Sequence, residues 1–153
     1  MADYGNLWDD YSIVFNSKLV DSGGDWSRLD EDEQEIAALW KLYVDINNGG
    51  FIQFFCNWGF QCLCYAMRGL KRIEDTSLYD LLDDTYCNVL DKFKNDTRLT
   101  AYWDIPEYLT DEDMERLDAA DTQFYETECE HFTKMAYEYY SQTLKKMVTP
   151  VNG

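Results

Sequence analysis

The sequence contains a single histidine, and this scarcity restricts the catalytic and metal chemistry that the protein can support. Any Cys–His or Ser–His catalytic pair would need His131, and no nucleophile-elbow signature accompanies it. Glu128 and His131 have the i, i+3 spacing of di-iron ligands, but such a site needs two copies of that motif. Phosphate-binding loops are absent too, because Gly23-Gly24 and Gly49-Gly50 lack the lysine of a P-loop. We therefore expect a protein that is not an enzyme and that holds no metal or cofactor.

Features of exported and membrane-spanning proteins are also missing. No stretch is long and apolar enough to span a bilayer, and residues 1–4 lack the basic-then-apolar order of a signal peptide. The cysteines are odd in number and have neither the spacing of a disulfide framework nor the pairs typical of zinc sites; they are Cys56, Cys62, Cys64, Cys87 and Cys129. These patterns favour a reducing compartment, so we expect a cytoplasmic protein that does not contact a membrane.

Positive charge is scarce, with 13 lysines and arginines against 30 acids and a net charge of −17. Residues 1–50 hold 11 acids and 3 bases, residues 51–100 hold 7 and 6, and residues 101–153 hold 12 and 4. Such a chain repels phosphates, which argues against direct binding of nucleic acid. Because self-repulsion lowers stability, we expect the acids to serve either solubility or a cationic partner.

Disorder is excluded despite this charge, because 46% of the residues are hydrophobic and 16% are aromatic. The hydrophobic residues recur with helical spacing almost throughout, and no alternating strand pattern is present. Residues 51–67 are apolar nearly all round and could form one buried helix; we favour two shorter helices with a break near Gly59. The other predicted helices cover residues 8–20, 30–47 and 76–94, and a long region from Thr110 to about Met147 that bends near residues 119–122. We expect an all-α fold in which residues 1–153 form one compact multi-helix domain.

Acidic residues gather at two of the predicted helix starts. The first cluster contains Asp30, Glu31, Asp32, Glu33 and Glu35, and the second contains Asp111, Glu112, Asp113, Glu115, Asp118 and Asp121. Both begin with the Asp-x-Asp pattern of an EF-hand loop, but neither has the glycine at the sixth position or the glutamate at the twelfth. Few lysines or arginines stand four residues away, so we expect rigid arrays of unpaired carboxylates. Neighbours at i, i+4 on a helix lie about 5–6 Å apart at Cβ, which is comparable to the spacing of phosphates along a nucleic acid strand.

The segment Asn47-Asn48-Gly49-Gly50-Phe51-Ile52-Gln53-Phe54-Phe55-Cys56-Asn57 resembles the signature of a bacterial all-α family first described through a neisserial DNA-mimic protein. Its Asn-Gly-Gly-Phe-x-Gln-Phe-Phe pattern joins a helix stop, a tight turn and an aromatic helix start in one register. The stretch from Ala66 to Leu70 and the helix start at residues 109–112 are also similar. The resemblance therefore covers most of the chain.

This resemblance implies a homodimeric acidic protein that occupies the DNA-binding surface of a helix-turn-helix transcription factor, blocks its binding to DNA and so modulates transcription. Residues 47–57 would then be architectural, and exposed carboxylates would meet the lysines and arginines that the partner otherwise aims at phosphates. No family motif specifies these carboxylates, so the two clusters above are chosen on local charge. Two alternatives stay open: an antitoxin-like or immunity-like inhibitor of a basic protein, and an enzyme with a carboxylate-lined cleft.

Overall fold

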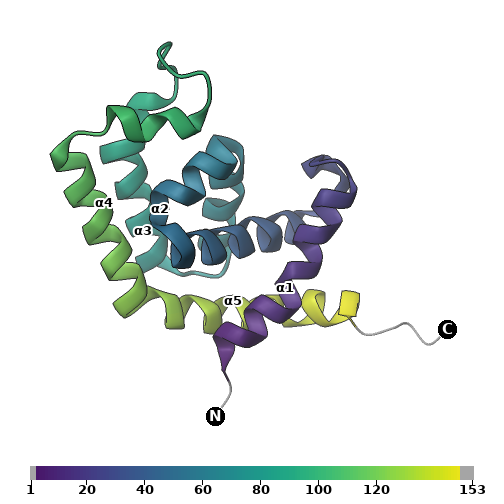
Figure 1. Ribbon diagram of the computed structural model, residues 1–153. Coiled ribbons are helices and arrows are strands. Elements are labelled where there is room, and N and C mark those ends of the chain that lie inside the picture. Colours follow the sequence, from purple (N-terminus) through teal and green to yellow (C-terminus); the bar gives the residue numbers. More distant parts are fainter. Residues whose placement is uncertain (1–2, 149–153) are drawn as a thin grey trace.

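Helices make up the regular structure of the chain in a computed structural model that describes residues 3–148, with side chains up to Lys146 (Figure 1). The five α-helices are α1 (Tyr4–Asp21), α2 (Glu31–Arg72), α3 (Thr76–Thr85), α4 (Asp111–Gln123) and α5 (Cys129–Val148). Short 3₁₀ or π segments cover Trp26–Arg28, Tyr86–Leu90, Asp91–Phe93, Tyr102–Tyr108 and Phe124–Glu128. No strand occurs within residues 3–148, and the predicted all-α class is confirmed.

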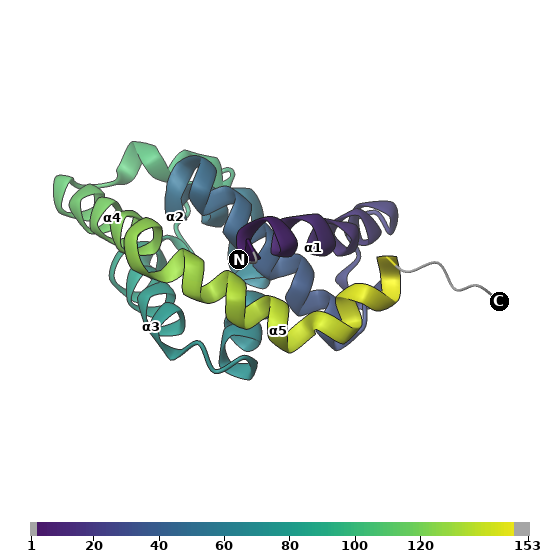
Figure 2. The same ribbon diagram turned by 90° about the horizontal axis from the view of Figure 1, so that it is seen from below.

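Helix α2 runs through the middle of the molecule, with α3 and α4 on one side of it and α1 on the other (Figures 1 and 2). Helix α5 continues from the α4 side and packs along α1. Buried side chains from all five helices form one core, including Trp8, Leu39, Phe54, Leu78, Leu117 and Phe132. Over residues 3–148, none of the helices has both the length and the apolar character needed to cross a membrane.

Two glycines break α2 into three helical segments, over residues 31–49, 51–58 and 60–72. Gly50 has φ 86° and ψ 179°, and Gly59 has φ 68° and ψ −157°, which are conformations that strain any residue with a side chain. Neither position has room for a side chain, because a Cβ on Gly50 would collide with Asp121 and one on Gly59 with Tyr102. The predicted stop at residues 47–50 and the predicted break near Gly59 are both confirmed.

One buried carboxylate, that of Asp45, holds the residues around the first break. It accepts hydrogen bonds from the side-chain amides of Gln53 and Asn57, each at 3.1 Å, and from the indole of Trp58 at 2.7 Å. All three donors follow the break and Asp45 precedes it, so these bonds fix the angle between two helical segments. Gln53 and Asn57 therefore act within the fold, as the family resemblance implies for this segment.

Side-chain caps begin helices α3 and α4. The carboxylate of Asp75 accepts from the backbone N–H of Leu78 at 3.2 Å, at the start of α3. The hydroxyl of Thr110 accepts from the backbone N–H of Asp113 at 3.0 Å, at the start of α4. Each cap satisfies a backbone donor that the first turn of a helix leaves free.

The chain departs from the predicted helices in three places. Helix α1 begins at Tyr4 rather than at residue 8, because Asp3 caps its first turn. The helix predicted over residues 76–94 leaves α geometry after Thr85 and continues as a π and then a 3₁₀ segment to Phe93. The bend expected near residues 119–122 is instead a π segment at Phe124–Glu128 that joins α4 to α5.

Candidate protein-binding surface

Helix α4 presents a row of exposed carboxylates along one side. Asp111, Glu115 and Asp118 are exposed and stand at i, i+4 and i+7, positions that share one face of an α-helix. Among the described side chains, none forms an ion pair with any of these three. The helix begins with a capping box between Thr110 and Asp113, and its dipole favours acids in the first turn. This row of charge is therefore held on a rigid element.

A second set of exposed carboxylates lies on α3, the helix that packs beside α4 (Figure 2). Asp80, Asp83 and Asp84 are exposed, and no described lysine, arginine or histidine pairs with them. A groove of about 210 Å³ separates the two helices, with Asp84 on one wall and Arg116 on the other. We call the following six residues the α3–α4 acidic face: Asp80, Asp83, Asp84, Asp111, Glu115 and Asp118.

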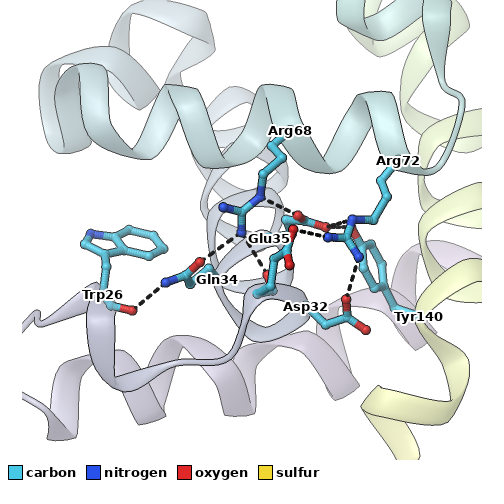
Figure 3. Close-up of polar contacts among 8 residues, drawn as sticks. Trp26, Asp32, Gln34, Glu35, Arg68, Arg72 and Tyr140 are labelled. Carbon is cyan, nitrogen blue, oxygen red and sulfur yellow. Dashed lines mark hydrogen bonds and ion pairs between the residues drawn. The ribbon is translucent and has the colours of Figure 1, made fainter.

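The first predicted cluster, at the start of α2, is neutralised by arginines from the end of the same helix (Figure 3). Glu35 is fully buried, and its carboxylate lies 2.5 Å from Nε of Arg68 and 3.1 Å from Nε of Arg72. Arg72 also pairs with Glu31 and, at 3.1 Å, with Asp32. The breaks in α2 bring its two ends side by side and so allow these contacts. The expectation of unpaired carboxylates is therefore wrong for Glu31, Asp32 and Glu35.

In this network, burial and the neighbouring carboxylates have opposite effects on the pKa of Arg72. Burial alone would lower the pKa of Arg72, but the neighbouring carboxylates of Glu35 and Glu31 raise it above its usual value. The hydroxyl of Tyr140 on α5 donates to Glu35 at 2.8 Å, and burial together with this carboxylate raises the pKa of Tyr140. Arg72 thus stays charged and Tyr140 stays neutral, and the network ties α5 to both ends of α2.

Two acids of the predicted clusters are buried against lysines. Glu33 lies 2.6 Å from Nζ of Lys18, and Asp113 lies 2.6 Å from Nζ of Lys92. Burial would raise the pKa of both carboxyls, but their lysine and backbone partners lower it below the usual value. The expectation of unpaired carboxylates is wrong for these two residues as well.

Three further acids of the predicted clusters, Asp121, Glu112 and Asp30, have different surroundings. Asp121 is half-buried and accepts from the backbone N–H of Phe51 at 2.9 Å, so it caps the segment that follows the first break of α2. Burial raises the pKa of Asp121, although the N–H of Phe51 opposes this shift. Glu112 is exposed but lies 3.0 Å from a guanidinium nitrogen of Arg116. Asp30 is exposed and sits at the N-cap of α2.

The local charge along the sequence does not single out the acids of α3. Residues 51–100 hold 7 acids and 6 bases and are nearly neutral as a block. In space, however, Arg68, Arg72 and Lys92 from this block neutralise acids of the two outer blocks. The sequence feature that could have indicated exposed acids on α3 is the i, i+4 spacing of Asp80 and Asp84 on an amphipathic helix.

Comparison with known proteins adds one finding. A family model described as DMP19-like protein matches residues 27–143. The chain belongs to the DMP19-like family. The match confirms the expected membership of the DNA-mimic family, and searches of curated proteins and of solved structures gave no match.

The DMP19-like family is a family of DNA mimics, so membership implies a partner that binds DNA. All six residues of the α3–α4 acidic face lie inside the matched range, whereas α1 lies outside it. The surface described above therefore belongs to the part of the chain that the family defines.

Most of the residues considered for metal binding lie at helix starts or in the core of this DMP19-like chain. Both Asp-x-Asp patterns are helix starts, and within the described residues no three His, Cys, Asp or Glu side chains could hold a metal ion. Cys56 and Cys62 are buried, and burial raises the pKa of Cys56 to about 11. His131 is exposed on α5.

Proposed function

We propose that this protein is a DNA mimic that covers the DNA-binding surface of a helix-turn-helix transcription factor and blocks its binding to DNA. It has no enzymatic activity, acts in the cytoplasm as a homodimer, and modulates transcription. The proposed contact surface is the α3–α4 acidic face, in place of the two clusters expected from local charge. Membership of the DMP19-like family supports the DNA-mimic part of this proposal.

The observation that carries the proposal is the presence of exposed carboxylates without an ion-pair partner among the described side chains on two neighbouring helices, α3 and α4. Asp111, Glu115 and Asp118 are separated by about 6 and 4.5 Å along the axis of α4, at 1.5 Å per residue. Phosphates on one DNA strand are spaced by about 3.4 Å of axis. Packed helix axes lie about 8–10 Å apart, between the widths of about 6 and 12 Å of the two DNA grooves. A set of basic side chains that spans two phosphate strands would thus meet carboxylates from two helices.

The size of the groove favours a macromolecular partner over a small substrate. It measures about 210 Å³, below the roughly 300–1,000 Å³ of small-molecule sites. Each exposed ion pair contributes only about 0.2–1 kcal/mol, so several pairs must act together. We therefore expect fast association that weakens steeply as ionic strength rises.

The test uses a helix-turn-helix repressor captured at low salt, purified, and bound to its operator DNA. The wild-type protein should release this DNA, as measured by fluorescence anisotropy. The triple variant Asp84→Asn, Glu115→Gln, Asp118→Asn should bind the repressor about tenfold more weakly, as expected for the loss of three exposed pairs.

A matched control removes the same charge elsewhere. Asp10→Asn, Asp21→Asn and Glu107→Gln change three exposed acids outside the α3–α4 acidic face, and together they should leave the affinity within about twofold. An equal loss in both triple variants would show that net charge alone matters and would refute the proposed surface. Capture of a basic toxin in place of a DNA-binding protein would favour the antitoxin-like alternative. Sedimentation velocity tests the homodimer, for which the mass of two chains is expected.

A further inference from the structure

A cavity of about 470 Å³ opens between the beginning of α1, the π segment at Phe124–Glu128 and the first turn of α5. It lies outside the α3–α4 acidic face. The side chains that line it include Asp3, Tyr4, Tyr125, Cys129, Glu130 and Thr133. Aromatic rings and carboxylates therefore share one cavity.

Two tyrosines give this cavity rigid aromatic walls. The hydroxyl of Tyr125 donates to the backbone carbonyl of Ile46 at 2.6 Å, although the residue is 49% exposed. The hydroxyl of Tyr4 donates to Glu138 at 3.4 Å, and its ring packs edge-on against Tyr137 with the centroids 6.1 Å apart. Each ring is thus held at its hydroxyl end while it borders the cavity. A fixed, accessible ring can bind a cation at little cost in conformational entropy.

The charge around the cavity is negative. Glu130 is exposed and forms no ion pair with a described side chain. Asp3 adds a second carboxylate, although it also accepts from the backbone N–H of Asn6 at 3.1 Å and caps α1. Nζ of Lys134 lies 6.0 Å from the centre of the Tyr4 ring, so one side of this ring already has a cation above it. Glu130 is therefore the carboxylate with most charge to offer a ligand.

The other groups that line the cavity favour an organic cation over a metal ion or an anion as its ligand. Burial raises the pKa of Cys129 and of Tyr125, so the thiol and the phenol stay neutral at pH 7. A metal ion is not favoured, because no suitable group of three ligands exists among the described residues. An anion would meet two carboxylates. A guanidinium suits this combination, since it stacks on aromatic rings and pairs with a carboxylate in one plane.

We propose that this cavity receives the guanidinium of an arginine side chain from the basic partner, stacked on Tyr125 and paired with Glu130. The inference rests on the proposed function, because that function supplies the basic protein. Tyr125 follows α4 by two residues, so a protein that lies along the α3–α4 acidic face can extend one arginine around the end of α4. The cavity adds a shaped contact to a face that otherwise attracts by charge alone.

The test is a titration of the whole chain with N-acetylarginine amide, followed by ¹H–¹⁵N chemical shifts. Saturable shifts at millimolar ligand are expected at the amides of Tyr4, Tyr125 and Glu130, and the neutral isostere N-acetylcitrulline amide should cause none. Glu130→Gln and Tyr125→Leu should each weaken binding about threefold, through loss of the ion pair and of the ring. Glu126→Gln, an equal change at an exposed neighbour outside the cavity, should leave the titration unchanged.

A second titration separates this inference from the proposed function. It uses an octapeptide of alternating arginine and glycine, which can reach the α3–α4 acidic face as well. Shifts at Glu115 and Asp118 without shifts around Glu130 would overturn the cavity assignment and leave the proposed function standing. Shifts at the cavity alone would support the assignment and count against the proposed function. Shifts of equal size with the citrulline compound, or unchanged affinity in both cavity variants, would also overturn it.

Discussion

Arg68 and Glu35 lie 33 residues apart in the sequence, yet Nε of Arg68 is 2.5 Å from the fully buried carboxylate of Glu35. Arg68→Met would leave this carboxylate with Arg72 and Tyr140 as its remaining partners. We expect a loss of about 2 kcal/mol in the free energy of unfolding, because a buried charge is then only partly compensated. Urea denaturation followed by far-UV circular dichroism measures it.

The control for this change is Arg116→Met. Arg116 also pairs with a glutamate, Glu112, but both side chains are largely exposed. Its loss should cost about 0.5 kcal/mol or less. Equal effects of the two substitutions would contradict the structural role assigned to the network at the ends of α2.

Gly50→Ala should destabilise the fold far more than a similar change at a glycine in open space. Gly50 and Gly24 both have positive φ, at 86° and 81°, but only at Gly50 would a Cβ collide with a neighbour, the carboxylate of Asp121. We expect a loss of about 1 kcal/mol for Gly24→Ala from backbone strain, and of more than about 3 kcal/mol for Gly50→Ala. Thermal unfolding of both variants measures the difference, and similar melting temperatures would show that the collision is relieved without cost.

Asp75→Asn should stabilise the protein at neutral pH. Burial and the nearby Glu128 raise the pKa of Asp75, against the opposing effects of Leu78 N–H and His131, and Oδ2 of Asp75 is buried without a hydrogen-bond partner among the described atoms. Because this pKa is higher in the folded than in the unfolded chain, ionisation opposes folding as the pH rises above about 4. Asparagine keeps the cap of α3 and cannot ionise.

The melting temperature of Asp75→Asn relative to wild type should therefore increase between pH 4 and pH 7. Differential scanning calorimetry across this range measures the change. A constant difference over the whole range would mean that Asp75 ionises in the fold without penalty.

Neutralising the α3–α4 acidic face should weaken binding yet stabilise the free protein. In a chain of net charge −17, the changes Asp84→Asn, Glu115→Gln and Asp118→Asn reduce self-repulsion. We expect a gain of about 0.5 kcal/mol in unfolding free energy at low salt, which disappears at high salt as screening removes the repulsion. Melting curves at low and high ionic strength measure it. A loss of stability would mean that these acids support the fold and would weaken their assignment to a partner.

Local features of the fold were predictable from the sequence. The breaks at Gly50 and Gly59 and the caps at Asp75 and Thr110 each depend on residues within a few positions of one another. The π segment at Phe124–Glu128 was not predictable, because it depends on how α4 and α5 pack and its sequence carries no distinct signal.

The candidate surface was predicted less well than the fold, because charge neutralisation depends on long-range contacts. Arg72 reaches Asp32 from 40 residues away, a pairing that follows only once α2 is known to fold back on itself. Glu115 and Asp118 remain exposed as expected, while Glu35 is buried, and the proposed contact surface includes the acids of α3 instead of the first cluster.

The folding back of α2 separates the acids of this protein into an inner and an outer group, which we expect to tolerate substitution differently. Replacing an inner acid such as Glu35 removes a buried partner of both Arg68 and Arg72, so we expect relatives of this chain to keep this acid. An outer acid such as Glu115 can drift, and relatives with other targets should differ mainly there. The same fold can in this way bind new partners through substitutions of its exposed acids alone.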